Sequence, residues 1–69
     1  MNGTIILNGE TTPLIEGGVI GILRNLEIDP AARGLAVAVN GAVVPRAQWP
    51  ELVLRDGDDV EVVKLFAGG

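Results

Sequence analysis

Two Asn-Gly dipeptides divide this sequence into two predicted β-hairpins. Asn8-Gly9 and Asn40-Gly41 each follow a short run of β-branched and aliphatic residues. Asn-Gly is the strongest short signal for a two-residue hairpin turn, because both central residues must adopt positive φ. Each run is therefore expected to pair with the segment that follows its turn. The four strands predicted in this way cover residues 4–7, 11–15, 35–39 and 42–44.

One segment between the hairpins has the apolar period of a helix. Its apolar residues recur at i, i+3, i+4 and i+7, which predicts a helix over 18–27 with one buried face. These residues are Val19, Ile22, Leu23 and Leu26. Gly18 stands at the predicted N-cap, and Gly21 in the helix interior costs about 1 kcal/mol relative to Ala. The helix is therefore expected to depend on tertiary packing.

The connection after the second hairpin carries Arg46 and Trp49. Segment 46–51 is predicted to form a short turn or a 3₁₀ connection, followed by a brief extended piece over 52–54. Trp49 is expected to pack against the sheet edge, since large aromatic side chains contribute most to small cores. Arg46 is expected to pair with a carboxylate, either on this chain or on a partner.

A final strand is predicted over 59–66, and its alternation assigns side chains to two faces. Val60 and Val62 are expected to face the helix, whereas Val63 and Leu65 point to the outer face. Exposed apolar side chains on a small protein can mark a partner site. They can equally be ordinary half-buried strand residues.

Together these elements predict an α+β fold with a mixed sheet of four to five strands and one main helix packed on one face. The 69 residues suffice for one domain. This domain is expected to span 1–69, with 67–69 as a flexible C-terminal tail.

The composition argues against an enzyme that acts alone. The chain has no Cys, His, Tyr or Ser, which removes most nucleophiles and acid-base groups, and no metal site is expected. The net charge of -4 gives no electrostatic footprint for nucleic acid. Neither a signal peptide nor a membrane span is recognisable, so a cytoplasmic location is expected. The acidic residues around Asp58 are expected to form a solvated turn, or a guide toward a basic partner.

The sequence ends in Gly68-Gly69. Glycine makes up about 7% of average protein sequence, so a terminal pair arises by chance in roughly one chain in two hundred. In a chain without a reactive side chain, the carboxylate of Gly69 is the main candidate for chemistry.

Read in order, four short motifs and Trp49 resemble the ThiS family of small sulfur-carrier proteins from thiamine biosynthesis. The motifs are Ala38-Val39-Asn40-Gly41, Val43-Val44-Pro45-Arg46, Asp56-Gly57-Asp58 and Gly68-Gly69. The resemblance covers nearly the whole length, and it implies the ubiquitin-like β-grasp fold. The sequence departs from the family at Gly18, where members often carry a Thr or Ser cap.

The resemblance implies that Gly69 is the reactive residue. An E1-like adenylating enzyme (ThiF-like), using ATP and Mg, would form a glycyl adenylate on Gly69. A sulfur donor such as a cysteine desulfurase would then provide the sulfur that converts the adenylate to a thiocarboxylate, so that Gly69 becomes 1-thioglycine. Thiazole synthase (ThiG-like) would receive this sulfur. The chain itself is expected to bind no cofactor. Partner contacts are expected at Val63, Leu65, Phe66, Ala67 and Gly68, although Phe66 could equally complete the core.

Three other functions fit the same residues. The chain could serve a related pathway, like the small subunit of molybdopterin synthase. It could be a ubiquitin-like modifier whose Gly69 forms an isopeptide bond with lysine. It could also be an interaction domain with an inert tail.

Overall fold

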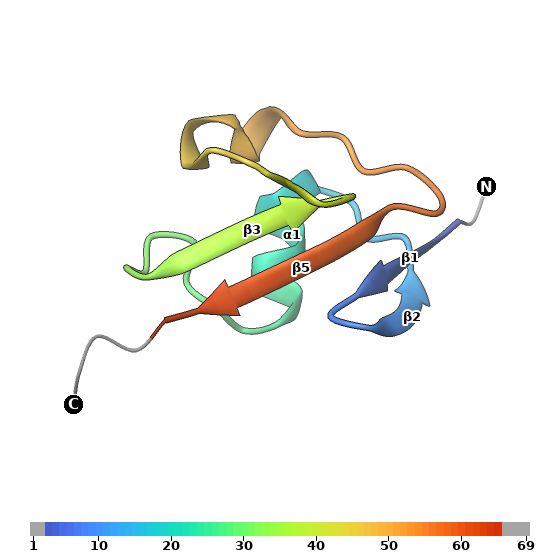
Figure 1. Ribbon diagram of the computed structural model, residues 1–69, viewed down its shortest axis with the longest axis horizontal. Coiled ribbons are helices and arrows are strands. Elements are labelled where there is room, and N and C mark those ends of the chain that lie inside the picture. The colour runs from blue at the N-terminus through green and yellow to red at the C-terminus, as the bar shows by residue number, and fades with distance from the viewer. Residues whose placement is uncertain (1–2, 66–69) are drawn as a thin grey trace.

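The computed structural model describes residues 3–65, and in it a five-stranded mixed sheet carries one main helix on one face (Figure 1). The order of strands across the sheet is β2-β1-β5-β3-β4. This confirms the predicted α+β architecture. The elements are β1 (Thr4–Leu7), β2 (Glu10–Pro13), α1 (Gly18–Asn25), β3 (Leu35–Val39), β4 (Ala42–Val43), the 3₁₀ helix η1 (Arg46–Glu51) and β5 (Asp59–Lys64).

Strand β5 lies at the centre of the sheet. It pairs antiparallel with β3 along its length, from Leu35 opposite Lys64 to Val39 opposite Val60. On its other side it runs parallel to β1, with Leu7 opposite Val60. The last strand is therefore inside the sheet, and it holds the two hairpins together.

The asparagines of both hairpin turns also bond to β5. Asn8 and Asn40 have φ of 50° and 52°, as the predicted turns require. The Asn8 Oδ1 atom accepts a hydrogen bond from the Val62 amide at 2.8 Å, and the Asn40 Oδ1 atom accepts one from the Asp59 amide at 2.9 Å. Each side chain thus satisfies a β5 amide close to the point where the neighbouring strand ends.

Several strands are shorter than predicted. Strand β2 ends at Pro13, which has no amide to donate to a ladder. One further backbone bond follows, from the Leu14 amide to the Gly3 carbonyl at 2.8 Å, and the Leu14 side chain packs against the core. Segment 52–54 is not part of the sheet. Strand β5 ends at Lys64, so Leu65 lies just beyond it and Phe66 lies outside the described residues.

Helix α1 ends two residues earlier than predicted. Glu27 adopts a φ of 60°, and its amide bonds to the Arg24 carbonyl while the Ile28 amide bonds to the Leu23 carbonyl. This pair of bonds is the Schellman closure of a helix. At the other end the N-cap is Gly17, not Gly18 as the sequence suggests, and no side chain caps it.

Gly21 is required by a close approach that the sequence does not reveal. A Cβ atom at this position would lie 1.9 Å from the Glu16 carbonyl oxygen. Alanine would therefore clash with the backbone, so its better helix propensity cannot be realised here.

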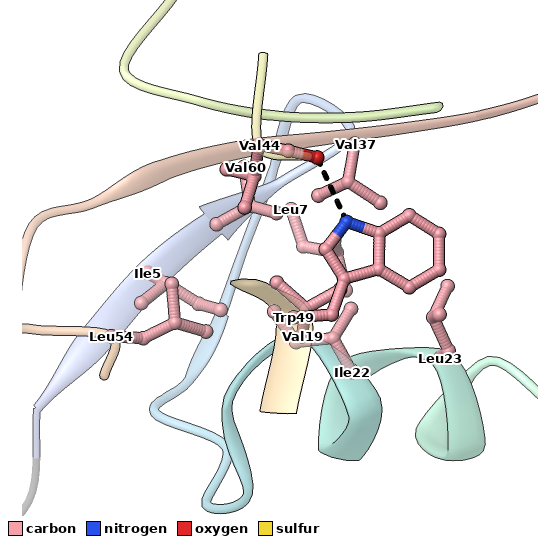
Figure 2. Close-up of a cluster of buried hydrophobic side chains, with 10 residues drawn as sticks. All are labelled: Ile5, Leu7, Val19, Ile22, Leu23, Val37, Val44, Trp49, Leu54 and Val60. Carbon is pink, nitrogen blue, oxygen red and sulfur yellow. Dashed lines mark hydrogen bonds between the residues drawn. The ribbon is translucent and has the colours of Figure 1, made fainter. Parts of the chain in front are cut away.

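The core lies between the sheet and α1, and Trp49 of η1 closes one side of it (Figure 2). Trp49 is 2% exposed, and its Nε1 atom donates to the Val44 carbonyl at 2.9 Å. This confirms the predicted packing role against the sheet edge. The remaining buried core residues are Ile5, Leu7, Val19, Ile22, Leu23, Val37, Val44, Leu54 and Val60.

The two turn asparagines predict different responses to one substitution. Asn8→Asp keeps the oxygen that accepts from Val62, so we expect a change in unfolding free energy within about 0.5 kcal/mol. Asn40→Asp keeps the equivalent oxygen but loses the Nδ2 group that donates to Asp58 Oδ1. It also places a second carboxylate next to that of Asp58, and the two negative charges repel each other. We expect it to destabilise the fold by roughly 1–2 kcal/mol in urea unfolding at pH 7. Equal effects of the two substitutions would contradict this account.

Candidate functional site

Only two of the predicted site residues, Val63 and Leu65, lie within the described part of the chain. Val63 is 45% exposed and Leu65 is 63% exposed. Val60 is buried and Val62 packs against the core, so the predicted assignment of faces is confirmed. Four further site residues lie outside the described residues: Phe66, Ala67, Gly68 and Gly69.

The outer face of the sheet carries two further apolar residues that the sequence reasoning did not single out. Ile6 on β1 is 39% exposed and Val43 on β4 is 75% exposed. Helix α1 covers the opposite face (Figure 1). The same alternation that places Val63 outside would have placed Ile6 outside as well, because its neighbours Ile5 and Leu7 are buried.

Small side chains lie between these larger ones. Ala36 on β3 pairs with Val63, and Ala38 pairs with Val43. The two alanines point away from the helix, on the same side of the sheet as Val43 and Val63. We call Ile6, Val43, Val63 and Leu65 the outer apolar face.

Carboxylates lie along the same side of the sheet. Asp59 is opposite Ile6 in the register, and Glu61 is opposite Ala38. Both are exposed. Both carboxylates thus lie between Ile6 and Val63 along β5, which favours a partner surface that combines apolar and basic groups.

Among residues 3–65, Arg46 pairs with backbone carbonyls and with no carboxylate, which does not support the predicted pairing with a carboxylate of this part of the chain. Its Nη1 atom donates to the Pro30 carbonyl, and its Nη2 atom donates to the Ala32 carbonyl at 2.8 Å. The guanidinium also lies 4.5 Å from the centre of the Trp49 ring, a cation–π contact. Arg46 therefore ties the loop after α1 to η1.

The described residues offer little other chemistry. Within residues 3–65, no group of three or more His, Cys, Asp or Glu side chains is placed to hold a metal ion. No helix in this range is long and apolar enough to cross a bilayer.

Comparison with known proteins identifies the family. The model of the ThiS family matches residues 5–69. The chain belongs to the ThiS family. It is 38% identical to the sulfur carrier protein ThiS of Thermus thermophilus over 63 residues, which cover 91% of this chain and 95% of that protein.

Two further comparisons agree with this family. The chain is 37% identical over 43 residues to the sulfur carrier protein ThiS of Escherichia coli. That match covers 62% of this chain and 65% of the relative, just under two thirds of its length. A crystal structure of thiamine biosynthesis protein ThiS from Geobacter metallireducens superposes with a TM-score of 0.71 at 29% identity, covering 100% of both chains. The fold is the ubiquitin-like β-grasp that the resemblance implies.

In this member of the ThiS family, the acidic turn before β5 is exposed to solvent, and its residues Asp56 and Asp58 also hold the turn in place. Asp58 accepts hydrogen bonds from the Arg55 amide at 2.8 Å and from Asn40 Nδ2 at 3.0 Å. Asp56 accepts one from the Thr4 amide at 2.8 Å. The hydrogen bond from the Arg55 amide, and to a lesser extent the one from the Asn40 side chain, lowers the pKa of Asp58 below its usual value of 3.8. The turn is therefore stabilised by ionised carboxylate.

This lowered pKa predicts an acid-dependent loss of stability. Because the folded state favours the charged carboxylate, the contribution is complete above the usual pKa of 3.8 and disappears as the pH falls through the lower folded-state value. We expect Asp58→Asn to be less stable than the parent in urea at pH 7, with the difference shrinking below about pH 4. Glu10→Gln, on the exposed edge strand β2, is the control. A difference that stays constant down to pH 2 would contradict the assignment.

Proposed function

We propose that this chain is a sulfur carrier whose Gly69 carboxylate is adenylated by an E1-like enzyme with ATP and Mg and then converted to a thiocarboxylate. The thiocarboxylate donates its sulfur to thiazole synthase for the thiazole ring of thiamine. The match of the ThiS family model through residue 69 carries this proposal, and the two relatives named as sulfur carriers support it.

The chemistry suits a terminal glycine. An α-carboxyl group has a pKa of about 3.5, so it is ionised at neutral pH. One carboxylate oxygen attacks the α-phosphorus of ATP, a new P–O bond forms, and pyrophosphate leaves. Hydrosulfide then attacks the acyl carbon, a C–S bond forms and AMP departs, which leaves the thiocarboxylate. Glycine places no Cβ beside this carbon, which favours entry into a narrow active site.

The absence of cysteine supports a carboxyl-borne sulfur. A side-chain persulfide needs a thiol, and the sequence has none. The chain also lacks His, Tyr and Ser, so the adenylating and sulfur-transfer steps are assigned to partner enzymes. The chain acts as their co-substrate, and the cytoplasmic location stays a prediction.

We further propose that the outer apolar face binds the partner enzymes. Two of its exposed side chains, Val63 and Leu65, lie at the end of β5, from which the chain continues toward Gly69. A partner that covers Val63 and Leu65 would therefore also receive the C-terminal residues. Removing such apolar side chains from water on binding favours association.

Intact-mass measurement tests the carrier function. We expect incubation with an E1-like enzyme, ATP, Mg and a sulfur source to raise the mass of the chain by the difference between one sulfur atom and one oxygen atom. Fragmentation should place the change on Gly69. The variant that lacks Gly69 should keep its fold and gain no mass. An unchanged parent mass would contradict the proposal, and Gly69 joined to lysines of other proteins would favour a modifier instead.

A matched pair of valines tests the docking face. Val63→Asp introduces a charge into the outer apolar face, and we expect it to raise the KM of the adenylating enzyme for the carrier about tenfold or more, equivalent to about 1.4 kcal/mol. Val53 is 74% exposed and lines a groove beside Gly17 at the start of α1. Val53→Asp should leave KM unchanged. Thermal unfolding checks that both variants fold, and equal KM values would overturn the assignment of the face.

A further inference from the structure

The described chain makes one more backbone hydrogen bond after β5 ends. The Leu65 amide donates to the Gly34 carbonyl at 2.7 Å. Gly34 directly precedes β3, and the last residue pair of the two strands is Leu35 with Lys64. The bond therefore holds the backbone at Leu65, four residues before Gly69.

The backbone conformation of Gly34 and its close contact with Leu65 both require glycine. Its φ is +75°, a conformation that side-chain-bearing residues rarely adopt. A Cβ atom at Gly34 would also lie 2.5 Å from the Leu65 carbonyl oxygen. A side chain here would push the Leu65 backbone away from its present place.

The loop that carries Gly34 is connected to the core. The Ala31 amide donates to Asp29 Oδ1 at 2.9 Å, which closes a turn at the start of the loop. Arg46 then bonds to the Pro30 and Ala32 carbonyls across an open groove that runs between the loop and η1. We call residues 29–34 the tail-root loop.

Arg46 is itself placed by a buried residue. Its guanidinium lies over the ring of Trp49, whose indole is buried and bonded to the Val44 carbonyl. The contacts thus run without interruption from the core through Trp49 and Arg46 to the tail-root loop, and from Gly34 to Leu65.

We propose that the tail-root loop positions the C-terminal residues for adenylation, with Gly34 and Arg46 as positioning residues. This inference rests on the proposed carrier function. Four residues beyond Leu65 reach at most about 14 Å, so a shift at Leu65 changes where the Gly69 carboxylate can lie. In-line attack on phosphorus tolerates little misplacement, and an error of 1 Å can reduce the rate about a hundredfold.

The proposal predicts a loss of kcat without a loss of binding. Gly34→Ala leaves Ile6, Val43 and Val63 of the outer apolar face in place, so KM for the carrier should stay within about twofold while kcat for pyrophosphate release falls about tenfold. Hydrogen exchange at the Leu65 amide should become faster. This second readout reports the Gly34 contact independently of any enzyme.

Gly57→Ala is the matched control. Gly57 also has a positive φ, +88°, but nothing lies within 4 Å of its Cβ position. It sits in the turn before β5, away from Leu65. The two variants therefore bear similar backbone strain, and only Gly34→Ala displaces Leu65. We expect the parent kcat and parent Leu65 exchange for Gly57→Ala.

Arg46→Lys provides a second route if Gly34→Ala fails to fold. Lysine keeps the positive charge but cannot form the paired bonds and the planar stack of a guanidinium. We expect kcat to fall several-fold, KM to be unchanged, and Leu65 exchange to rise. An unaltered kcat in this variant would remove Arg46 from the proposal.

The outcomes separate the two proposals. A parent chain that is not adenylated overturns the carrier function and the positioning role with it. A parent that is adenylated, together with Gly34→Ala and Gly57→Ala variants of equal kcat, overturns the positioning role alone. A rise in KM with unchanged kcat would make the tail-root loop a docking surface, which also overturns the proposal.

Discussion

The hydrogen bonding of β5 is the interaction on which the rest of this structure depends. Strand β5 pairs with β3 on one side and β1 on the other, so it joins two hairpins that have no strand pairing with each other. The hairpin asparagines add bonds to β5 amides near both of its ends. Because each bond joins a turn to one particular β5 amide, these side-chain bonds help to define the register of the strand.

The central place of β5 also decides where function can lie. A strand inside the sheet brings the end of the domain beside the outer apolar face and the tail-root loop at once. The two features suit different steps: the face suits binding, because Val63 is exposed near the end of β5, and Ile6 and Val43 are exposed on the same side of the sheet. The loop suits orientation, because it holds the backbone of Leu65 directly.

Local patterns predicted much of this arrangement. The two Asn-Gly turns, the apolar period of α1 and the alternation in β5 each depend on neighbours in sequence, and each was confirmed. The partners of Arg46 could not be predicted, because carbonyl groups of a loop leave no signal in residue identity. Gly21 likewise appeared to weaken the helix, whereas it is required by a carbonyl oxygen that approaches only in the folded chain.

The sequence by itself determined the fold class, the faces of the strands and the family, since these depend on periodicity, turn chemistry and motifs in order. It also singled out Gly69, by its terminal position and by the lack of reactive side chains. Only the tertiary structure placed Ile6 and Val43 on the same face as Val63 and brought Gly34 against Leu65. Such contacts join residues that are distant in sequence, so they exist only once the strands have paired and the core has closed.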